Sequence, residues 1–452
     1  MYLEEITHYI MENGAHFCDI RKEKQDKTVI TVHNGEPTLV RRGQEEGFMV
    51  RTLVENGWGY MASSNFHTIK KSARRALSMA KWISKSKNEK IGLSDREIIK
   101  ENRAIPMKKN IFDISPEEKI LFLKEFDNNL QEDSVQSVTL EYHDVLLEKE
   151  IYSSEGTHIT MKIPRVYLSA TVVGKNDSLQ RVVEKIGNTG GFEIVKEAFA
   201  RKDIILNRLK ALLHAQVPPT GHMSLIMDPH LTGIFIHEAL GHAAEGDVVA
   251  SSHSCIEGKI GEKIAAESVT ITDDPTMKGY GQYPFDDEGT KAVPRILVKD
   301  GICTDYILDR ESAWKLGRNS NGGARAEDFR VKPLVRMSNT MMKPGTRSLE
   351  ELIEQAGTGI YAQSSRGGEV DPAQGTFQFN AQVAYKIEKG ELTVPLRDVS
   401  FSGSILSALQ SISGLSSDFK MKASECGKGQ IIPVSSGGPH ALLDTISVGG
   451  RA

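Results

Sequence analysis

The stretch FQFNAQVAYKIEKGELTVPLRDV, residues 377–399, decides the character of the C-terminal half of this chain. Apolar and polar side chains alternate along it, and Lys389-Gly390 supplies a turn near its middle. Alternation with a period of two is typical of strands with one buried face, so the pattern predicts a hairpin. Short strand-like runs with glycine turns also cover 296–310 and much of 332–399. We therefore expect a mostly β C-terminal domain with one or two embedded helices, of which 228–244 is one.

The N-terminal half has the pattern of a mixed α and β domain. Strand-like runs fill most of 15–64, with Asn34-Gly35 and Asn56-Gly57 as hairpin signals, and strand signals resume over 138–173. The charged, aperiodic residues 86–110 are expected to form an exposed connection. Apolar residues at helical spacing, or helix-start signals, predict helices at 1–14, at 68–83, from Ser115-Pro116 onward and at 192–214.

A proline-rich break separates the two halves. Val217-Pro218-Pro219-Thr220-Gly221 ends the last helical pattern of the N-terminal half, because two prolines and a glycine cannot continue a helix. We therefore predict an α+β fold with an N-terminal α+β domain over 1–217 and a C-terminal, mostly antiparallel β domain over 218–452. The length of 452 residues suits two domains.

Charge and cysteine content narrow the functional class. The 56 Lys and Arg residues nearly balance the 60 Asp and Glu residues, which argues against binding nucleic acid through a general basic surface. The 4 cysteines have no paired short spacing, so a reducing compartment is expected rather than a disulfide framework. We find neither a signal peptide nor the run of about 18 apolar residues that a membrane span needs. The expected location is the cytoplasm, with no membrane contact.

The segment IFIHEALGHAAEGD, residues 234–247, carries the most specific chemistry in the sequence. His237 and His242 bracket Glu238 on a short predicted helix. Two imidazoles can hold a zinc ion that acidifies water, and a neighbouring glutamate can take the proton from that water. This arrangement is typical of a zinc hydrolase in which Glu238 is the catalytic base.

The spacing of the two histidines requires a local distortion. Residues five apart lie about 140° apart around a regular helix, so both imidazoles reach one ion only if the helix widens or breaks between them. Gly241 immediately precedes His242 and is the residue at which a π-bulge or a helix end costs least. We therefore expect such a distortion at this glycine.

A structural interpretation of the same segment competes with the metal site. Glu238 and His242 are four apart, so a regular helix would make them a surface pair. A metal site also needs a third protein ligand. Glu245 lies three residues after His242 and thus on its face, and Cys426 lies in a glycine-flanked loop. Residue chemistry leaves these two roughly level, and further candidates are Asp247, His253, Cys255 and Cys303.

Five further segments follow the same motif in order along the chain. They are DDEGT at 286–290, RMSNT at 336–340, GGEVDPAQGTFQF at 367–379, CGKGQIIPV at 426–434 and ISVGG at 446–450. Together with HEALGHAAEGD at 237–247 they strongly resemble the TldD/PmbA family of metallopeptidases, in particular its catalytic TldD branch. The N-terminal half is similar mainly in length and in its pattern of helices and strands.

The resemblance implies a ligand set and an assembly. It implies one zinc ion per chain, held by His237, His242 and Cys426, with Glu238 as the catalytic base. Glu245 would then not bind the metal itself but would orient one of the metal ligands. Members of the family form dimers, often with an inactive paralogue, so a homodimer or a heterodimer is expected. They cleave unfolded peptides held inside the assembly.

Two functions remain open from the sequence. The first is a zinc-dependent peptidase that hydrolyses unfolded or extended peptides held by β-strand addition, with Glu238 assisting a metal-bound water as nucleophile. The second is a peptide-binding or regulatory scaffold subunit whose structural metal site is closed by a fourth protein ligand such as Glu245. The acidic pair at 273–274 and the acidic triplet at 286–288 are expected to be either solvated turns or a hydrogen-bonded structural element, rather than a second metal site.

Overall fold

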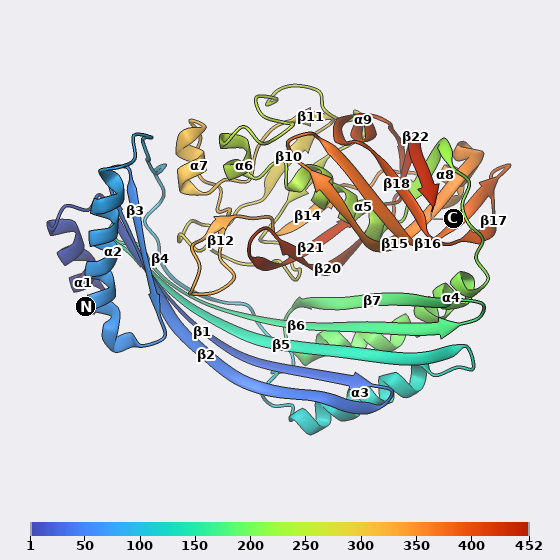
Figure 1. Ribbon diagram of the computed structural model, residues 1–452, viewed down its shortest axis with the longest axis horizontal. Helices are drawn as coiled ribbons and strands as arrows, with labels where there is room; N and C mark the ends of the chain where they lie inside the picture. The colour runs from blue at the N-terminus through green and yellow to red at the C-terminus, as the bar shows by residue number, and fades with distance from the viewer. Residues whose placement is uncertain (1, 451–452) are drawn as a thin grey trace.

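A strongly curved sheet dominates the N-terminal half of the protein in the computed structural model, which describes residues 2–450 (Figure 1). Its strand order is β3-β2-β1-β5-β6-β4, with β7 also paired to β6. All neighbours are antiparallel except β4, which runs parallel to β6. The strands are β1 (Phe17–His33), β2 (Glu36–Val54), β3 (Gly57–Ser63), β4 (Lys100–Ala104), β5 (Val135–Ser153), β6 (His158–Lys175) and β7 (Leu179–Thr189).

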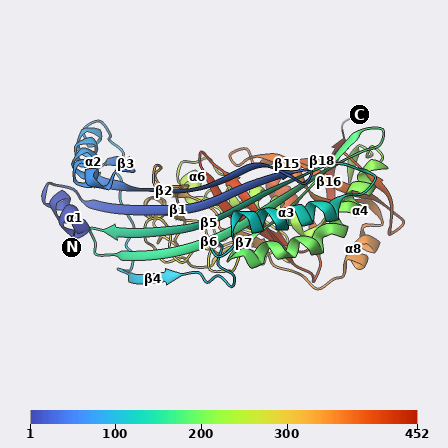
Figure 2. The same cartoon turned by 90° about the horizontal axis from the view of Figure 1, so that it is seen from below.

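The two faces of this sheet pack against different partners. Leu140 and Leu168 belong to a core that α3 and α4 share with one face. Side chains two residues apart, such as Ile163 and Arg165, point from the other face toward the C-terminal half, which sits in the concave side of the sheet (Figures 1 and 2). The helices of this half are α1 (Tyr2–Glu12), α2 (Ile69–Ser84), α3 (Pro116–Leu130) and α4 (Lys202–Leu213), with 3₁₀ turns at Phe66–Thr68 and Phe192–Arg201.

Most predicted N-terminal elements are confirmed, and two differ. Asn34 and Gly35 turn between β1 and β2 with φ of 50° and 77°, as a tight hairpin requires. The expected connection over 86–110 contains β4, a largely exposed strand without apolar alternation. The expected helix over 192–214 begins as a 3₁₀ helix, because its buried Phe192, Val195 and Ala198 recur every three residues rather than at 3.6.

The C-terminal half contains two larger sheets. In one, β15-β8-β22-β18-β16-β17 are neighbours, β15 also pairs with β16, and five strands thereby close into a ring. The other has the order β11-β10-β9-β14-β21-β20, which leaves β20 at an edge. The strands of the first sheet are β8 (Gly221–Met227), β15 (Thr358–Asp371), β16 (Thr376–Glu388), β17 (Glu391–Leu396), β18 (Val399–Ser404), β19 (Ile412–Leu415) and β22 (Ala441–Gly450). Those of the second are β9 (Ile271–Asp273), β10 (Arg295–Lys299), β11 (Ile302–Cys303), β14 (Asn339–Met342), β20 (Lys420–Gly427) and β21 (Ile431–Gly438).

Short helices and one small ribbon complete this half. The strands β12 (Ala324–Arg325) and β13 (Leu334–Val335) pair with each other. The helices are α5 (Pro229–Ile236), α6 (Gly246–Ala250), α7 (Arg310–Lys315), α8 (Leu349–Ala356) and α9 (Ile405–Gln410). The predicted hairpin turn at Lys389-Gly390 joins β16 to β17, whereas α8 lies within a range expected to be mostly strand. Mixed helices and antiparallel sheets confirm the predicted α+β class.

The acidic segments are structural, as expected. Asp273 bonds Arg295 at 2.7 Å in a fully buried pair within the C-terminal half. Asp287 bonds Lys149 at 2.6 Å, and Glu288 bonds Arg51 at 3.1 Å. Since Lys149 and Arg51 belong to the N-terminal sheet, the triplet at 286–288 ties the two halves together through buried ion pairs.

The described strands before residue 190 belong to the N-terminal sheet, and those after residue 220 belong to the C-terminal sheets. The domain boundary at 217/218 stays a prediction. Within residues 2–450, we find no helix with the length and apolar character needed to traverse a lipid bilayer.

Candidate metal centre

The segment with the two histidines forms a widened helical turn. Asp228 caps α5 by accepting a hydrogen bond from the Leu231 N–H at 2.8 Å, and Pro229 occupies the first turn. At His237 the helix changes to a π-helical turn over His237–Gly241. The His242 N–H donates to the His237 carbonyl at 3.2 Å, five residues back. The distortion predicted from the five-residue spacing is confirmed.

Gly241 is required here by space rather than by φ. A Cβ atom at this position would lie 2.0 Å from the Sδ atom of Met337. The widened turn therefore packs directly against the buried side chain of Met337, which must shift if residue 241 carries a side chain.

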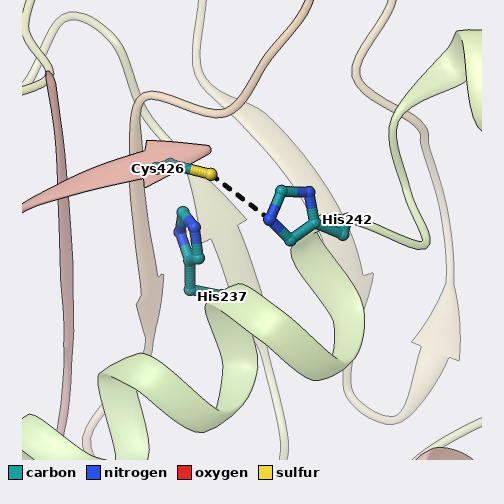
Figure 3. Close-up of side chains that lie close together, drawn as sticks. All are labelled: His237, His242 and Cys426. Atoms are coloured by element: carbon teal, nitrogen blue, oxygen red, sulfur yellow. Dashed lines mark hydrogen bonds between the residues drawn. The ribbon is translucent and has the colours of Figure 1, made fainter. Parts of the chain in front are cut away.

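The turn brings both imidazoles to one cysteine. Candidate ligand atoms of His237, His242 and Cys426 all lie within 4.8 Å of one another, and all three residues are buried. The Sγ atom of Cys426 is 3.2 Å from Nε2 of His242. Figure 3 shows the cysteine pointing from its strand toward the two rings on the helix. These three are the only group of three such side chains found among residues 2–450.

The donor set fits a zinc ion. Two imidazoles and one thiolate are borderline-soft ligands of the kind zinc prefers, and three protein ligands leave a fourth position open. The Nδ1 atom of His237 is buried without a hydrogen-bond partner in the described protein. A buried polar nitrogen without a partner is costly, and a metal ligand is one explanation for it.

The electrostatics of the cluster favour a thiolate. Burial alone would raise the pKa of the Cys426 thiol, but the neighbouring His237 and His242 outweigh it and lower that pKa to about 4. Burial likewise opposes charge on His242, yet Glu245 and Cys426 raise its pKa well above the usual value. In the metal-free protein, protons on the two histidines balance the negative charge of the thiolate. A bound metal cation would take over that role.

Glu245 stands behind His242 rather than beside the cysteine. Its carboxylate is fully buried and lies 3.0 Å from Nδ1 of His242, on the side of the ring opposite Nε2. Lys428 lies 3.0 Å from the same carboxylate. Burial opposes its charge, but His242 and Lys428 lower the pKa of Glu245 to about 2, so it is ionised. This geometry orients the imidazole, and it leaves Glu245 outside the three-residue cluster.

Two residues that sequence reasoning did not single out as part of the site hold the cysteine loop. The buried Arg336 donates to the backbone carbonyls of Cys426 at 2.6 Å and Gln430 at 2.8 Å. Lys428 donates to Asp247 at 2.9 Å and to the Val335 carbonyl at 2.8 Å. Arginine in RMSNT and lysine in CGKGQ were visible in the sequence, but only the fold reveals that both brace Cys426.

Glu238 faces open space beside the cluster. Its side chain is 31% exposed, and its Oε2 atom lies 3.7 Å from Nε2 of His242. It lines two clefts, of about 230 Å³ and about 430 Å³, which also contain His237 and His242 respectively. A carboxylate at this place can reach a water molecule that approaches the three ligand atoms. The other candidate ligands, Asp247, His253, Cys255 and Cys303, are not part of the cluster.

Comparisons with known proteins identify the family of this chain. Residues 18–80, 109–212 and 220–450 match domain 1, the central domain and the C-terminal domain of the PmbA/TldA metallopeptidases. The chain is 37% identical to a metalloprotease of Methanothermobacter thermautotrophicus, with 97% of each chain covered. It is 32% identical to a zinc metalloprotease TldD homolog of Saccharolobus solfataricus, covering 97% of this chain and 98% of the relative.

A solved structure shows the same fold. The crystal structure of a putative modulator of a DNA gyrase from Thermotoga maritima superposes on this chain with a TM-score of 0.81. The superposition covers 98% of each chain, at 18% sequence identity. At that identity the likeness concerns the fold alone. Because the family domains and the close relatives span nearly the whole length, this chain belongs to the PmbA/TldD family of metallopeptidases.

Proposed function

We propose that this protein is a zinc-dependent peptidase that hydrolyses unfolded or extended peptides. The observation that carries the proposal is the buried cluster of His237, His242 and Cys426 beside the partly exposed carboxylate of Glu238. Three ligands with an open fourth position are typical of catalytic zinc sites, whereas structural sites have four protein ligands.

In this proposal the residues divide the work. His237, His242 and Cys426 would hold one zinc ion, which supplies Lewis-acid activation of water and of a peptide carbonyl. Glu238 takes the proton from the attacking water and passes it to the leaving amine. Glu245 fixes the ring of His242 through Nδ1, so that Nε2 stays directed at the cluster.

Two unpaired strand edges beside Glu238 support binding of an extended chain. β20 carries Cys426 and pairs only with β21 among the described strands. β15 pairs with β8 only through residues 359–362, so residues 363–371 leave that edge open. The cleft of about 230 Å³ lies between these two edges, since Gly367, Gly368 and Ser424 line it together with Glu238. An added strand uses main-chain hydrogen bonds and therefore reads little sequence, which suits unfolded peptides.

The scaffold alternative with a closed metal site has less support. It needs a fourth protein ligand, and the carboxylate of Glu245, the best candidate, lies on the Nδ1 side of His242 and outside the three-residue cluster. A cytoplasmic location and assembly as a homodimer, or as a heterodimer with an inactive paralogue, complete the proposal. Light scattering of the protein alone and with a co-expressed paralogue tests the assembly.

Cleavage of casein tests the peptidase directly. The arms are the wild type, Glu238→Gln and the control Glu262→Gln, a surface carboxylate that pairs with Lys259, each with and without chelator and with zinc content measured. We expect Glu238→Gln to retain zinc and to lose about 10²–10⁴-fold in rate, the usual value of a general base. The control should match the wild type, and chelator should abolish cleavage. A zinc-loaded wild type that does not cleave, or a fully active Glu238→Gln, would refute the proposal.

A further inference from the structure

Another cleft lies between the two halves of the protein, and Glu425 lines both it and the cleft beside the metal centre. The cleft between the halves has a volume of about 260 Å³ and is bounded on one side by the concave face of the N-terminal sheet. The other side is formed by loops of the C-terminal half and by residues of β21. Leu147, Met161, Ile163 and Ile432 contribute apolar walls, and Arg165 and Arg325 contribute two guanidinium groups.

Both arginines are buried and keep free donors. Arg165 and Arg325 are 4% and 6% exposed. Arg165 donates to the carbonyls of Tyr280 at 2.8 Å and Gln282 at 3.0 Å. Arg325 donates to the carbonyls of Met337 at 2.6 Å and Pro433 at 2.8 Å. A guanidinium has five N–H groups, so each of these has donors left over at the wall of the cleft.

These two arginines stand out from the other buried arginines. Seven arginines are buried within the described residues, and five of them have a carboxylate within 4.0 Å. Arg165 and Arg325 are the two without one. These two positive charges are therefore not paired with a carboxylate, although the guanidinium of Arg325 lies 4.9 Å from the centre of the Tyr283 ring.

The one carboxylate that acts on both arginines is already bonded elsewhere. Asp287, whose charge acts on both arginines, is already bonded to Lys149 at 2.6 Å and to the Ala326 N–H at 2.7 Å. Burial lowers the pKa of Arg165 to about 10 and that of Arg325 to about 9, and the repulsion from Arg165 adds to the second effect. Both shifts are the response of buried cations that lack an anion.

The lining also indicates which anion fits. Five carboxylates border the same cleft, and their charges disfavour a dianion such as phosphate more than a monoanion; they belong to Asp144, Asp286, Asp287, Glu327 and Glu425. Planar guanidinium groups match the geometry of a carboxylate, and the apolar walls match an aliphatic body attached to it. We propose that this cleft binds the carboxylate of a small ligand with an apolar body, with Arg165 and Arg325 as its counter-charges. The C-terminal residue of a peptide and a free aliphatic acid share this chemistry.

The inference does not depend on peptidase activity, because the acceptors of both arginines are backbone carbonyls outside the metal cluster. The test is isothermal titration calorimetry of the full-length zinc-loaded protein, repeated after the metal has been stripped. The probes are N-acetyl-leucyl-leucine, its C-terminal amide, hexanoate and inorganic phosphate. The variants are Arg325→Gln, Glu425→Gln and the control Arg103→Gln, whose arginine is exposed and pairs with Glu101.

We expect the peptide acid to bind with and without metal, and the amide to bind about 10–100-fold more weakly, as loss of a charge-assisted hydrogen bond predicts. Arg325→Gln should weaken binding of the peptide acid by a similar factor and leave binding of the amide unchanged. The control Arg103→Gln should change the affinity for neither. Glu425→Gln, at an exposed position, should tighten binding of the acid both with zinc and after the metal has been stripped, so the test stands even if Arg325→Gln does not fold. Binding of hexanoate as well as the peptide acid points to any aliphatic acid, and binding of the peptide acid alone points to a peptide C-terminus. Equal binding of acid and amide, tighter binding of phosphate, or no binding of the acid below about 1 mM would overturn the inference.

Discussion

Replacing Glu245 by glutamine isolates the orienting role assigned to this buried carboxylate. The side chain is fully buried and ionised, with His242 and Lys428 each at 3.0 Å and Arg336 at 3.7 Å. Glutamine keeps the size and one acceptor oxygen but removes the charge that holds the imidazole. Loss of such a partner behind a metal-ligating histidine costs about 10–100-fold in metal affinity, or about 1.4–2.7 kcal/mol.

The measurement is competition for zinc with a chromophoric chelator, with thermal unfolding of each variant recorded in parallel. Asp247→Asn is the matched control, because Asp247 accepts hydrogen bonds from the same Lys428 at 2.9 Å but forms neither a hydrogen bond nor an ion pair with His242. We expect Glu245→Gln to lose zinc affinity and Asp247→Asn to keep it. Equal losses in both variants would show that Lys428 matters and the orientation of His242 does not. An unchanged affinity in Glu245→Gln would refute the reasoning outright.

Three further predictions follow from the same geometry. Gly241→Ala should destabilise the protein by about 1–3 kcal/mol through overpacking against Met337. The control Gly427→Ala should not destabilise it, because the added Cβ meets no atom within 4 Å. Equal melting temperatures of the two variants would contradict this prediction. In metal-free protein the pKa of Cys426, lowered to about 4 by the histidines against the effect of burial, leaves a thiolate above that pH. The rate of its alkylation, measured by mass spectrometry, should therefore stay constant from pH 9 to 6 and fall only near pH 4. A rate that rises tenfold per pH unit through neutrality would disprove the lowered pKa. Stripping zinc should lower the melting temperature of the wild type, since a ligand bound only to the folded state stabilises it, and should have no effect on Cys426→Ser; the same shift in both would exclude the cysteine as a ligand.

The sequence predicted the local features of the site well. The five-residue spacing of His237 and His242, with Gly241 between them, is enough to require a widened turn, because helix geometry is local. Likewise, Asn34-Gly35 and Lys389-Gly390 correctly predict the two hairpin turns in which they lie, since turn conformation depends on the residues in the turn. Residues alone did not separate Glu245 from Cys426, because Cys426 comes 184 residues after His242 and meets it only through the fold.

Features that depend on long-range packing gave no sequence signal. β4 is a strand because β6 offers it an edge, although its own residues KENRA have no apolar alternation. Arg165 and Arg325 are 160 positions apart and look like any other arginine in the sequence. Only the fold shows that both are buried in one cleft and that neither has a carboxylate partner.

X-ray absorption at the zinc edge of the loaded protein tests most directly whether the widened turn and the edge strand build one open metal site. We predict that zinc has one sulfur neighbour at about 2.3 Å, two imidazole nitrogens at about 2.0–2.1 Å and one further light atom from solvent. Cys426→Ser should remove the sulfur signal. A spectrum without sulfur, or one that requires four protein ligands, would contradict the account.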